Sequence, residues 1–109
     1  MEYEVLLTSE AEEFINSILD LKLKAKVLRT IDLLLDFGPY LSMPHSKSVK
    51  NGQGISELRT QQGNNIVRLF YFNSEEKLYV VTSGYVKKEQ KLKQSEIFKA
   101  IEIMNRIME

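Results

Sequence analysis

The sequence contains no cysteine and only one histidine among its 109 residues. The absence of cysteine excludes a disulfide framework and a thiolate metal site. A single histidine excludes a histidine pair as acid and base within one protomer, and no cluster of His, Asp and Glu has the spacing of metal ligands. We therefore expect a protein that uses no metal ion or other cofactor.

Long hydrophobic runs are also missing. No apolar stretch approaches the roughly 20 residues that span a bilayer, and the first residues, Met1-Glu2-Tyr3-Glu4, lack the basic and then apolar order of a secretion signal. The chain is long enough for one compact core and too short for two ordinary domains. These features predict a single cytoplasmic domain over residues 1–109 that does not enter a membrane.

The chain has no net charge, with 15 basic and 15 acidic side chains, but these charges are unevenly distributed. Residues 1–37 hold eight acidic and four basic side chains, whereas residues 38–109 hold seven acidic and eleven basic ones. The neutral total alone argues against a nucleic-acid binder. The segregation indicates either a basic working face or a chance distribution of solvated charges.

The N-terminal third of the chain predicts a strand and two helices. Residues 2–8 alternate loosely and favour a strand. Ser9 stands three residues before Glu12, a pattern typical of a helix start, and the helix should run to about Leu19. A second helical pattern begins near Lys22 and ends at Gly38-Pro39. The apolar residues expected on the buried sides are Phe14, Ile15, Ile18, Leu19, Val27, Leu28, Ile31, Leu34 and Leu35.

The rest of the chain predicts an ordered loop, three strands and a last helix. Residues 38–54 contain two prolines and three glycines without a sustained period, which favours the loop. Residues 55–61, 65–73 and 77–85 are rich in β-branched and aromatic side chains and predict an antiparallel meander. Residues 95–108 carry a wide apolar stripe that ends with Ile107 and Met108, and predict a helix. The expected order is βααβββα, an α+β domain.

Five short motifs follow one another in a fixed order. They are Leu-Ser-Met-Pro at 41–44, Ser-Glu-Leu-Arg at 56–59, Asn-Ile-Val-Arg-Leu-Phe-Tyr at 65–71, Gly-Tyr-Val-Lys-Lys-Glu-Gln-Lys at 84–91, and Glu-Ile at 96–97 with Ala100. Together they resemble the RelE/ParE superfamily of toxins, and within it the HigB-like, phage-derived branch. The family commonly continues its Lys-Lys-x-Gln-Lys run with Thr and then Thr-Pro. This chain departs from that pattern at Glu89, Leu92 and Lys93.

The resemblance implies a toxin of a type II toxin–antitoxin pair. Such a toxin inhibits translation as a metal-independent endoribonuclease that cuts messenger RNA in the ribosomal decoding site. The implied fold is a sheet with two N-terminal helices on one face and the catalytic residues on its concave side. The implied partners are a cognate antitoxin of the helix-turn-helix type, the ribosome and its mRNA, with operator DNA bound only through the antitoxin.

The candidate catalytic residues are Glu57, Arg59, Arg68, Tyr71 and Lys87. Cations spaced by two residues on strands share a face and can meet a phosphate backbone together. Arg68 matches a family position that stabilises the phosphate or the transition state; the alternative is a cross-strand partner for Glu57. Glu57 and Arg59 are either an orienting pair or an exposed ion pair. Tyr71 can stack on a base or donate a proton, or else it packs within the sheet.

Six further residues are candidates for RNA binding. Lys88, Gln90 and Lys91 lie in the basic run that begins at Lys87, for which the alternative is a solvated loop. The others are the loop residues Lys47 and Lys50, and Tyr85 at the end of the last strand. His45 has an intrinsic pKa suited to acid–base work, although a lone loop histidine is usually incidental.

Two other functions remain open for the sequence. A ParE-like relative would poison DNA gyrase through protein contacts and would not need Arg68 or Lys87 for chemistry. A non-catalytic module retained for antitoxin binding is the second, and the neutral net charge and Glu89 favour it. The strand arginines and the Lys-Lys-x-Gln-Lys run resemble the RNA-cleaving branch instead.

Overall fold

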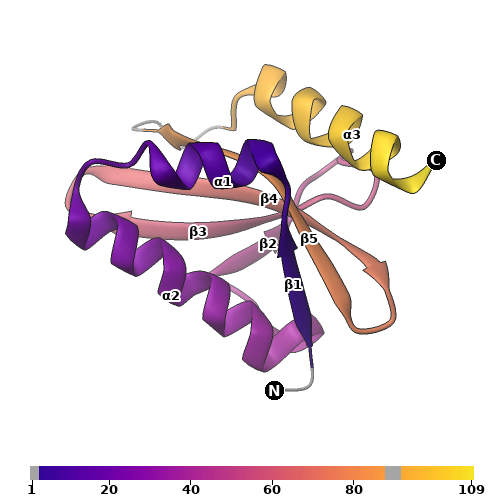
Figure 1. The fold of residues 1–109 in the computed structure, drawn as a ribbon, viewed down its shortest axis with the longest axis horizontal. Coiled ribbons are helices and arrows are strands. Elements are labelled where there is room, and N and C mark those ends of the chain that lie inside the picture. The colour runs from indigo at the N-terminus through magenta and orange to yellow at the C-terminus, as the bar shows by residue number, and fades with distance from the viewer. Residues whose placement is uncertain (1–2, 88–91) are drawn as a thin grey trace.

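The computed structural model describes residues 3–87 and 92–109 (Figure 1). Its centre is a five-stranded sheet with the strand order β1-β5-β4-β3-β2. The elements along the chain are β1 (Glu4–Leu7), α1 (Ser9–Asn16), α2 (Leu21–Phe37), a 3₁₀ helix (Gly38–Tyr40), β2 (Ser46–Ser48), β3 (Ser56–Gln62), β4 (Asn65–Glu75), β5 (Leu78–Lys87) and α3 (Gln94–Met108). The α+β class and the order of the seven predicted elements are confirmed.

Two features of the sheet were not predicted. β2 lies inside the segment expected to be a loop, because a three-residue Ser-Lys-Ser strand carries no apolar alternation; it pairs antiparallel with β3. β1 pairs parallel with β5, so the sheet is mixed rather than antiparallel. The direction of this pairing depends on how α1 and α2 return the chain to the sheet, which local sequence does not encode.

α1 begins at Ser9, as predicted, but its capping residue differs from the prediction. Thr8 is the N-cap, and its hydroxyl accepts a hydrogen bond from the Ala11 amide at 3.0 Å. Ser9 is already helical, and its hydroxyl donates to the Glu10 carboxylate at 3.2 Å. The predicted reciprocal cap between Ser9 and Glu12 is therefore wrong.

Most residues expected in the core are buried, with four exposed exceptions. Leu19 is 92% exposed because α1 ends at Asn16 and leaves this residue in the connection to α2. Leu28, Ile107 and Met108 are exposed as well. In each case the predicted apolar stripe is wider or longer than the surface that the sheet covers.

The sheet separates two apolar clusters. One lies under α1 and α2 and includes Ile15, Val27, Leu34, Leu58, Val67, Leu69, Tyr79 and Val81. The other lies under α3 and includes Val49, Ile55, Phe70, Phe72, Val80, Ile97, Ala100, Ile101 and Met104. Alternate residues of β4 enter alternate clusters, as strand geometry requires. The two N-terminal helices therefore cover one face, and α3 packs on the other (Figure 1).

A β-bulge interrupts this alternation in β5. Phe70 of β4 is paired with Ser83, whereas the next residue, Tyr71, is paired with Val81, so that Thr82 is an extra residue. The Thr82 hydroxyl donates to the Phe70 carbonyl at 3.3 Å. An extra residue reverses the facing of all side chains that follow it in the strand.

The bulge decides which face the end of β5 presents. Beyond it, Gly84 pairs with Leu69 on the side of α1, and Tyr85 pairs with Arg68 on the side of α3. Lys87, two residues further, shares the face of Tyr85. Without the bulge, Tyr85 and Lys87 would face α1 and α2, away from Arg68.

Candidate active site

Four cationic side chains and one carboxylate line a pocket on the α3 side of the sheet. Its volume is about 370 Å³. Lys47 comes from β2, Lys50 from the turn after it, Glu57 and Arg59 from β3, and Arg68 from β4. The remaining lining residues are Ser48, Val49, Leu92, Gln94 and Ile97. Five of the residues that the sequence analysis selected therefore lie in one pocket.

Strand register explains this convergence. Glu57 and Arg59 share a face because they are two residues apart on β3. In the antiparallel ladder Arg59 lies directly opposite Arg68, and Lys47 lies opposite Glu57. Like charges in directly opposed positions repel one another. The carboxylate of Glu57, diagonal to Arg68, offsets this repulsion.

The Glu57 carboxylate binds the Arg68 guanidinium and lies near that of Arg59. Arg68 Nη1 donates to Glu57 Oε2 at 2.8 Å, and Arg59 Nε lies 3.8 Å from Oε1. Glu57 and Arg68 are 3% and 2% exposed, while the Arg59 side chain is 23% exposed. Arg68 is thus a cross-strand partner of Glu57 and also lines the pocket. Because the pair is buried, the cost of desolvating its two charges offsets much of their Coulomb attraction. The pair therefore contributes little net free energy to the stability of the fold.

Tyr85 and Lys87 extend the polar surface across β5. The Tyr85 ring stacks on Phe70, with centroids 6.0 Å apart, and Lys87 Nζ lies 5.9 Å from the centroid of the Tyr85 ring. The Tyr85 hydroxyl accepts a hydrogen bond from the Lys93 amide at 3.0 Å. Burial raises the pKa of the Tyr85 phenol, against the opposing effects of this hydrogen bond and the Arg68 charge. At neutral pH the phenol is therefore protonated and can donate a proton.

Tyr71 lies on the opposite face of the sheet from Arg68. It is 7% exposed and belongs to the cluster under α1 and α2. Its ring meets that of Tyr79 edge to face, with centroids 5.8 Å apart, and its hydroxyl shares a 2.6 Å hydrogen bond with that of Ser46. Tyr71 therefore does not line the pocket with Glu57 and Arg68, and it packs within the sheet, which is the alternative that the sequence left open.

The remaining candidates fall in two groups. Lys88, Gln90 and Lys91 lie outside the described residues, as does Glu89, so their proposed contacts with RNA stay predictions. His45 is exposed and lines a second, smaller pocket together with Arg59 and Gln61. Gln61 was not among the predicted site residues, although its spacing of two residues from Arg59 places it on the same strand face.

Residues 3–87 and 92–109, which the structure describes, contain neither a metal-binding cluster nor a membrane-spanning helix. No group of three or more His, Asp and Glu side chains in these ranges could hold a metal ion. None of the helices described there is long and apolar enough to cross a membrane.

Residues 14–105 match the sequence model of the family described as phage-derived Gp49-like protein. The chain belongs to this Gp49-like family. A solved structure, that of an archaeal RelE–RelB complex from Pyrococcus horikoshii OT3, is similar with a TM-score of 0.57 and 14% sequence identity. The similarity covers 84% of this chain and 100% of that chain. No curated protein sequence matches the chain.

The family match confirms the phage-derived family that the motifs indicated. At 14% identity the solved structure establishes a RelE-like fold. The family match spans every residue that lines the larger pocket of the Gp49-like protein. The pocket therefore lies entirely within the segment that matches the family.

Proposed function

We propose that this Gp49-like protein is the toxin of a RelE-type toxin–antitoxin system and inhibits translation by cleaving ribosome-bound mRNA without a metal ion. Family membership and the RelE-like fold support the toxin. The observation that carries the cleavage proposal is the pocket in which Arg59, Arg68, Lys47 and Lys50 surround the Glu57 carboxylate. Such a cationic hollow fits a phosphodiester.

Cleavage through the ribose 2′-hydroxyl requires a base, stabilisation of charge on the phosphorane and an acid for the leaving oxygen. Arg68 is suited to the second task because Glu57 fixes its guanidinium through the 2.8 Å hydrogen bond. Arg59 is more exposed and is suited to meeting the phosphate directly. Glu57 is a positioning residue in this proposal, since both arginines lie against it.

The exposed lysines Lys47 and Lys50 hold the RNA backbone at the mouth of the pocket. Lys87 and the protonated Tyr85 phenol lie on the same face and are the candidates for proton donation. A bound ribosome supplies alignment of the strand, so a modest acid–base set suffices. The relative from P. horikoshii is found in a complex with RelB, which supports a cognate antitoxin as the partner of this chain.

The proposal is tested by inducing the protein in bacteria and mapping new RNA 5′ ends. We expect growth arrest and new cleavage sites with the native protein, and a strong loss of both with Arg59→Ala. Lys99→Ala serves as the control, because Lys99 is an exposed residue of α3 that does not line the pocket. Normal growth at high soluble expression, without new RNA 5′ ends, would contradict the proposal.

A non-catalytic, antitoxin-binding module is the second candidate. It is favoured by the burial of Glu57 and Arg68, since a pair that is 3% and 2% exposed can have a purely structural role. It predicts soluble expression without RNA cleavage in the same experiment. DNA damage signalling without RNA cleavage would indicate the ParE-like gyrase poison instead.

A further inference from the structure

A second hollow, of about 260 Å³, adjoins the cationic pocket. It is lined by Pro44, His45, Arg59, Gln61 and Ile66. Arg59 lines both hollows, so the two meet at this residue. The hydrogen bond from the Arg59 amide to the His45 carbonyl, at 2.8 Å, holds the segment of Pro44 and His45 against β3.

The chemistry of this hollow differs from that of its neighbour. Ile66, which is 6% exposed, and Pro44 supply apolar surface. Gln61 lies directly opposite Ile66 in the ladder, and its amide donates a long, 3.4 Å hydrogen bond to the Gly63 carbonyl. Arg59 is the one charged residue among those that line it. The hollow therefore suits a small, flat, neutral group with polar edges.

We propose that this hollow binds the base of a nucleotide whose phosphate occupies the cationic pocket, an inference that rests on RNA being the ligand. Proteins hold unstacked bases on the planes of aromatic or guanidinium groups and hydrogen-bond their edges. Arg59 and His45 offer such planes, and the Gln61 amide offers both a donor and an acceptor. At about 260 Å³ the hollow is smaller than the roughly 300–1,000 Å³ of sites for drug-sized ligands.

The shared position of Arg59 links the two parts of the ligand. In a nucleotide one ribose joins the phosphate to the base, and in the protein one residue, Arg59, lines both hollows. The guanidinium of Arg59 can therefore contact a phosphate on one side and a base on the other. The phosphate contact carries no sequence information, so any base preference of the protein should come from Gln61 and His45.

The direct test is an NMR titration of the whole chain with uridine 5′-monophosphate, adenosine 5′-monophosphate and, as the control without a base, ribose 5-phosphate. We expect all three to shift the backbone signals of Lys47 and Lys50. Only the nucleotides should shift the Gln61 side-chain amide and the His45 ring. Equal shifts with ribose 5-phosphate, or none at Gln61 and His45, would overturn the base site.

This titration does not depend on cleavage, so it separates the base site from the proposed function. Nucleotide-specific shifts without RNA cleavage in cells would contradict the ribonuclease and retain the site. Cleavage in cells without nucleotide-specific shifts would contradict the base site and retain the ribonuclease.

A second test uses the bases found at mapped cleavage sites. Gln61→Glu removes the amide donor and leaves only acceptors, so it should disfavour uracil, whose edge carries two carbonyl oxygens beside one N–H, relative to cytosine, whose edge carries an amino group. We expect the frequency of uracil at one nucleotide position beside the cut to fall several-fold relative to the frequencies of the other bases. Gln62→Glu carries the same change of charge on the other strand face and should leave the distribution unaltered.

An identical base distribution for native protein, Gln61→Glu and Gln62→Glu would contradict the proposal. Where the added charge lowers cleavage too far to map, Gln61→Ala replaces it, because it removes the amide without introducing a carboxylate. Its expected result is a more even distribution of bases at the same nucleotide. An unchanged distribution in Gln61→Ala would contradict the proposal equally.

Discussion

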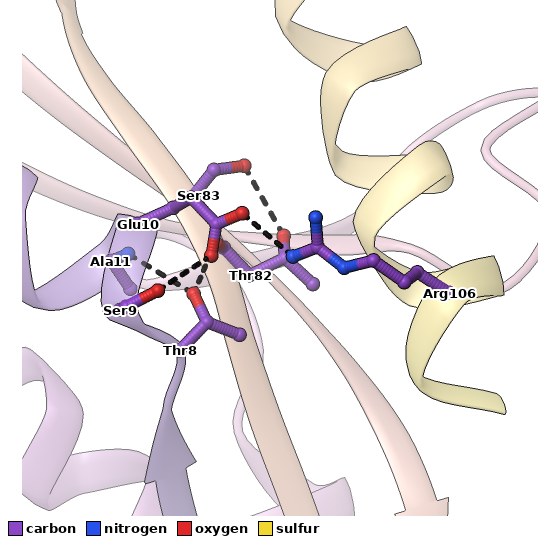
Figure 2. Close-up of polar contacts among 7 residues, drawn as sticks. All are labelled: Thr8, Ser9, Glu10, Ala11, Thr82, Ser83 and Arg106. Carbon is purple, nitrogen blue, oxygen red and sulfur yellow. Dashed lines mark hydrogen bonds and ion pairs between the residues drawn. The ribbon is translucent and has the colours of Figure 1, made fainter.

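The hydroxyl of Thr8 donates a 2.6 Å hydrogen bond to the carbonyl of Thr82, the extra residue of the bulge in β5 (Figure 2). The same hydroxyl accepts a hydrogen bond from the Ala11 amide and so caps α1. One side chain thus fixes the start of a helix and the bulge that turns Tyr85 and Lys87 toward Arg68.

Thr8→Val should lower the free energy of unfolding by about 1–2 kcal/mol, because it removes a helix cap and leaves the Thr82 carbonyl without the hydroxyl donor. Thr8→Ser should keep most of the stability. Ser9→Ala is the matched control and should change it by less than about 0.5 kcal/mol, since the Ser9 hydroxyl only meets the neighbouring Glu10 carboxylate. Urea unfolding measures all three; a larger loss in Ser9→Ala than in Thr8→Val would contradict the cap.

Arg68→Met should destabilise the fold by about 3–5 kcal/mol, because it leaves the Glu57 carboxylate buried without the hydrogen bond from Arg68. The double variant Glu57→Gln/Arg68→Met should recover much of this loss by removing both charges. RNA cleavage should nevertheless stay reduced in the double variant, on the order of a hundredfold or more, if Arg68 stabilises the phosphorane. Recovery of both stability and cleavage would assign Arg68 a structural role alone.

Gly84→Ala should destabilise the protein because α1 packs closely on β5 at this residue. A Cβ atom at Gly84 would lie 2.5 Å from Leu69 Cδ2 and 2.8 Å from Phe14 Cδ2. Such overpacking typically costs about 1–3 kcal/mol. Adding Phe14→Leu to Gly84→Ala should recover part of the stability in thermal or urea unfolding, and a further loss would contradict the proposed clash.

The ion pair between Glu10 and Arg106 should make a small part of the stability dependent on pH. Arg106 Nη2 lies 2.6 Å from Glu10 Oε2 and joins α3 to α1 (Figure 2). The hydrogen bond from Arg106 holds the pKa of the Glu10 carboxyl below its usual 4.5. A depressed carboxyl pKa stabilises the fold above the unfolded value of 4.5, and this contribution is lost as the pH falls through the folded pKa.

Native protein and Arg106→Gln should therefore differ in urea midpoint at pH 7 and converge in acid below pH 4.5. The difference should also shrink at high salt, because both side chains are partly exposed. A difference that is independent of pH and salt would assign Arg106 a packing role instead.

The sequence predicted the elements well because each helix and long strand has its own apolar period. The exceptions are structural features without a local signal. β2 is too short to alternate, and the direction of β1 beside β5 is set by the route of α1 and α2. The cap was misassigned because Thr8 and Ser9 are both good N-cap residues, and the position of Thr82 in the sheet selects Thr8.

The pocket was predictable in part. Glu57, Arg59 and Arg68 follow from a spacing of two and an antiparallel pairing, and the same spacing excludes Tyr71, which is three residues from Arg68. Tyr85 and Lys87 are different, because their facing depends on the bulge at Thr82. Counting along β5 from Val81 without the bulge places them on the wrong side of the sheet.

The helices α1 and α2 cover one face of the sheet and the cationic pocket lies on the other, so this neutral molecule has its acidic and basic charges separated. Residues 1–37, which include both helices, carry the excess of acidic side chains, and the cationic pocket opens on the other face. A molecule without net charge feels little net force in the field of a polyanion, but a molecule with separated charges feels a torque. Near RNA, the protein should therefore rotate to present its pocket first.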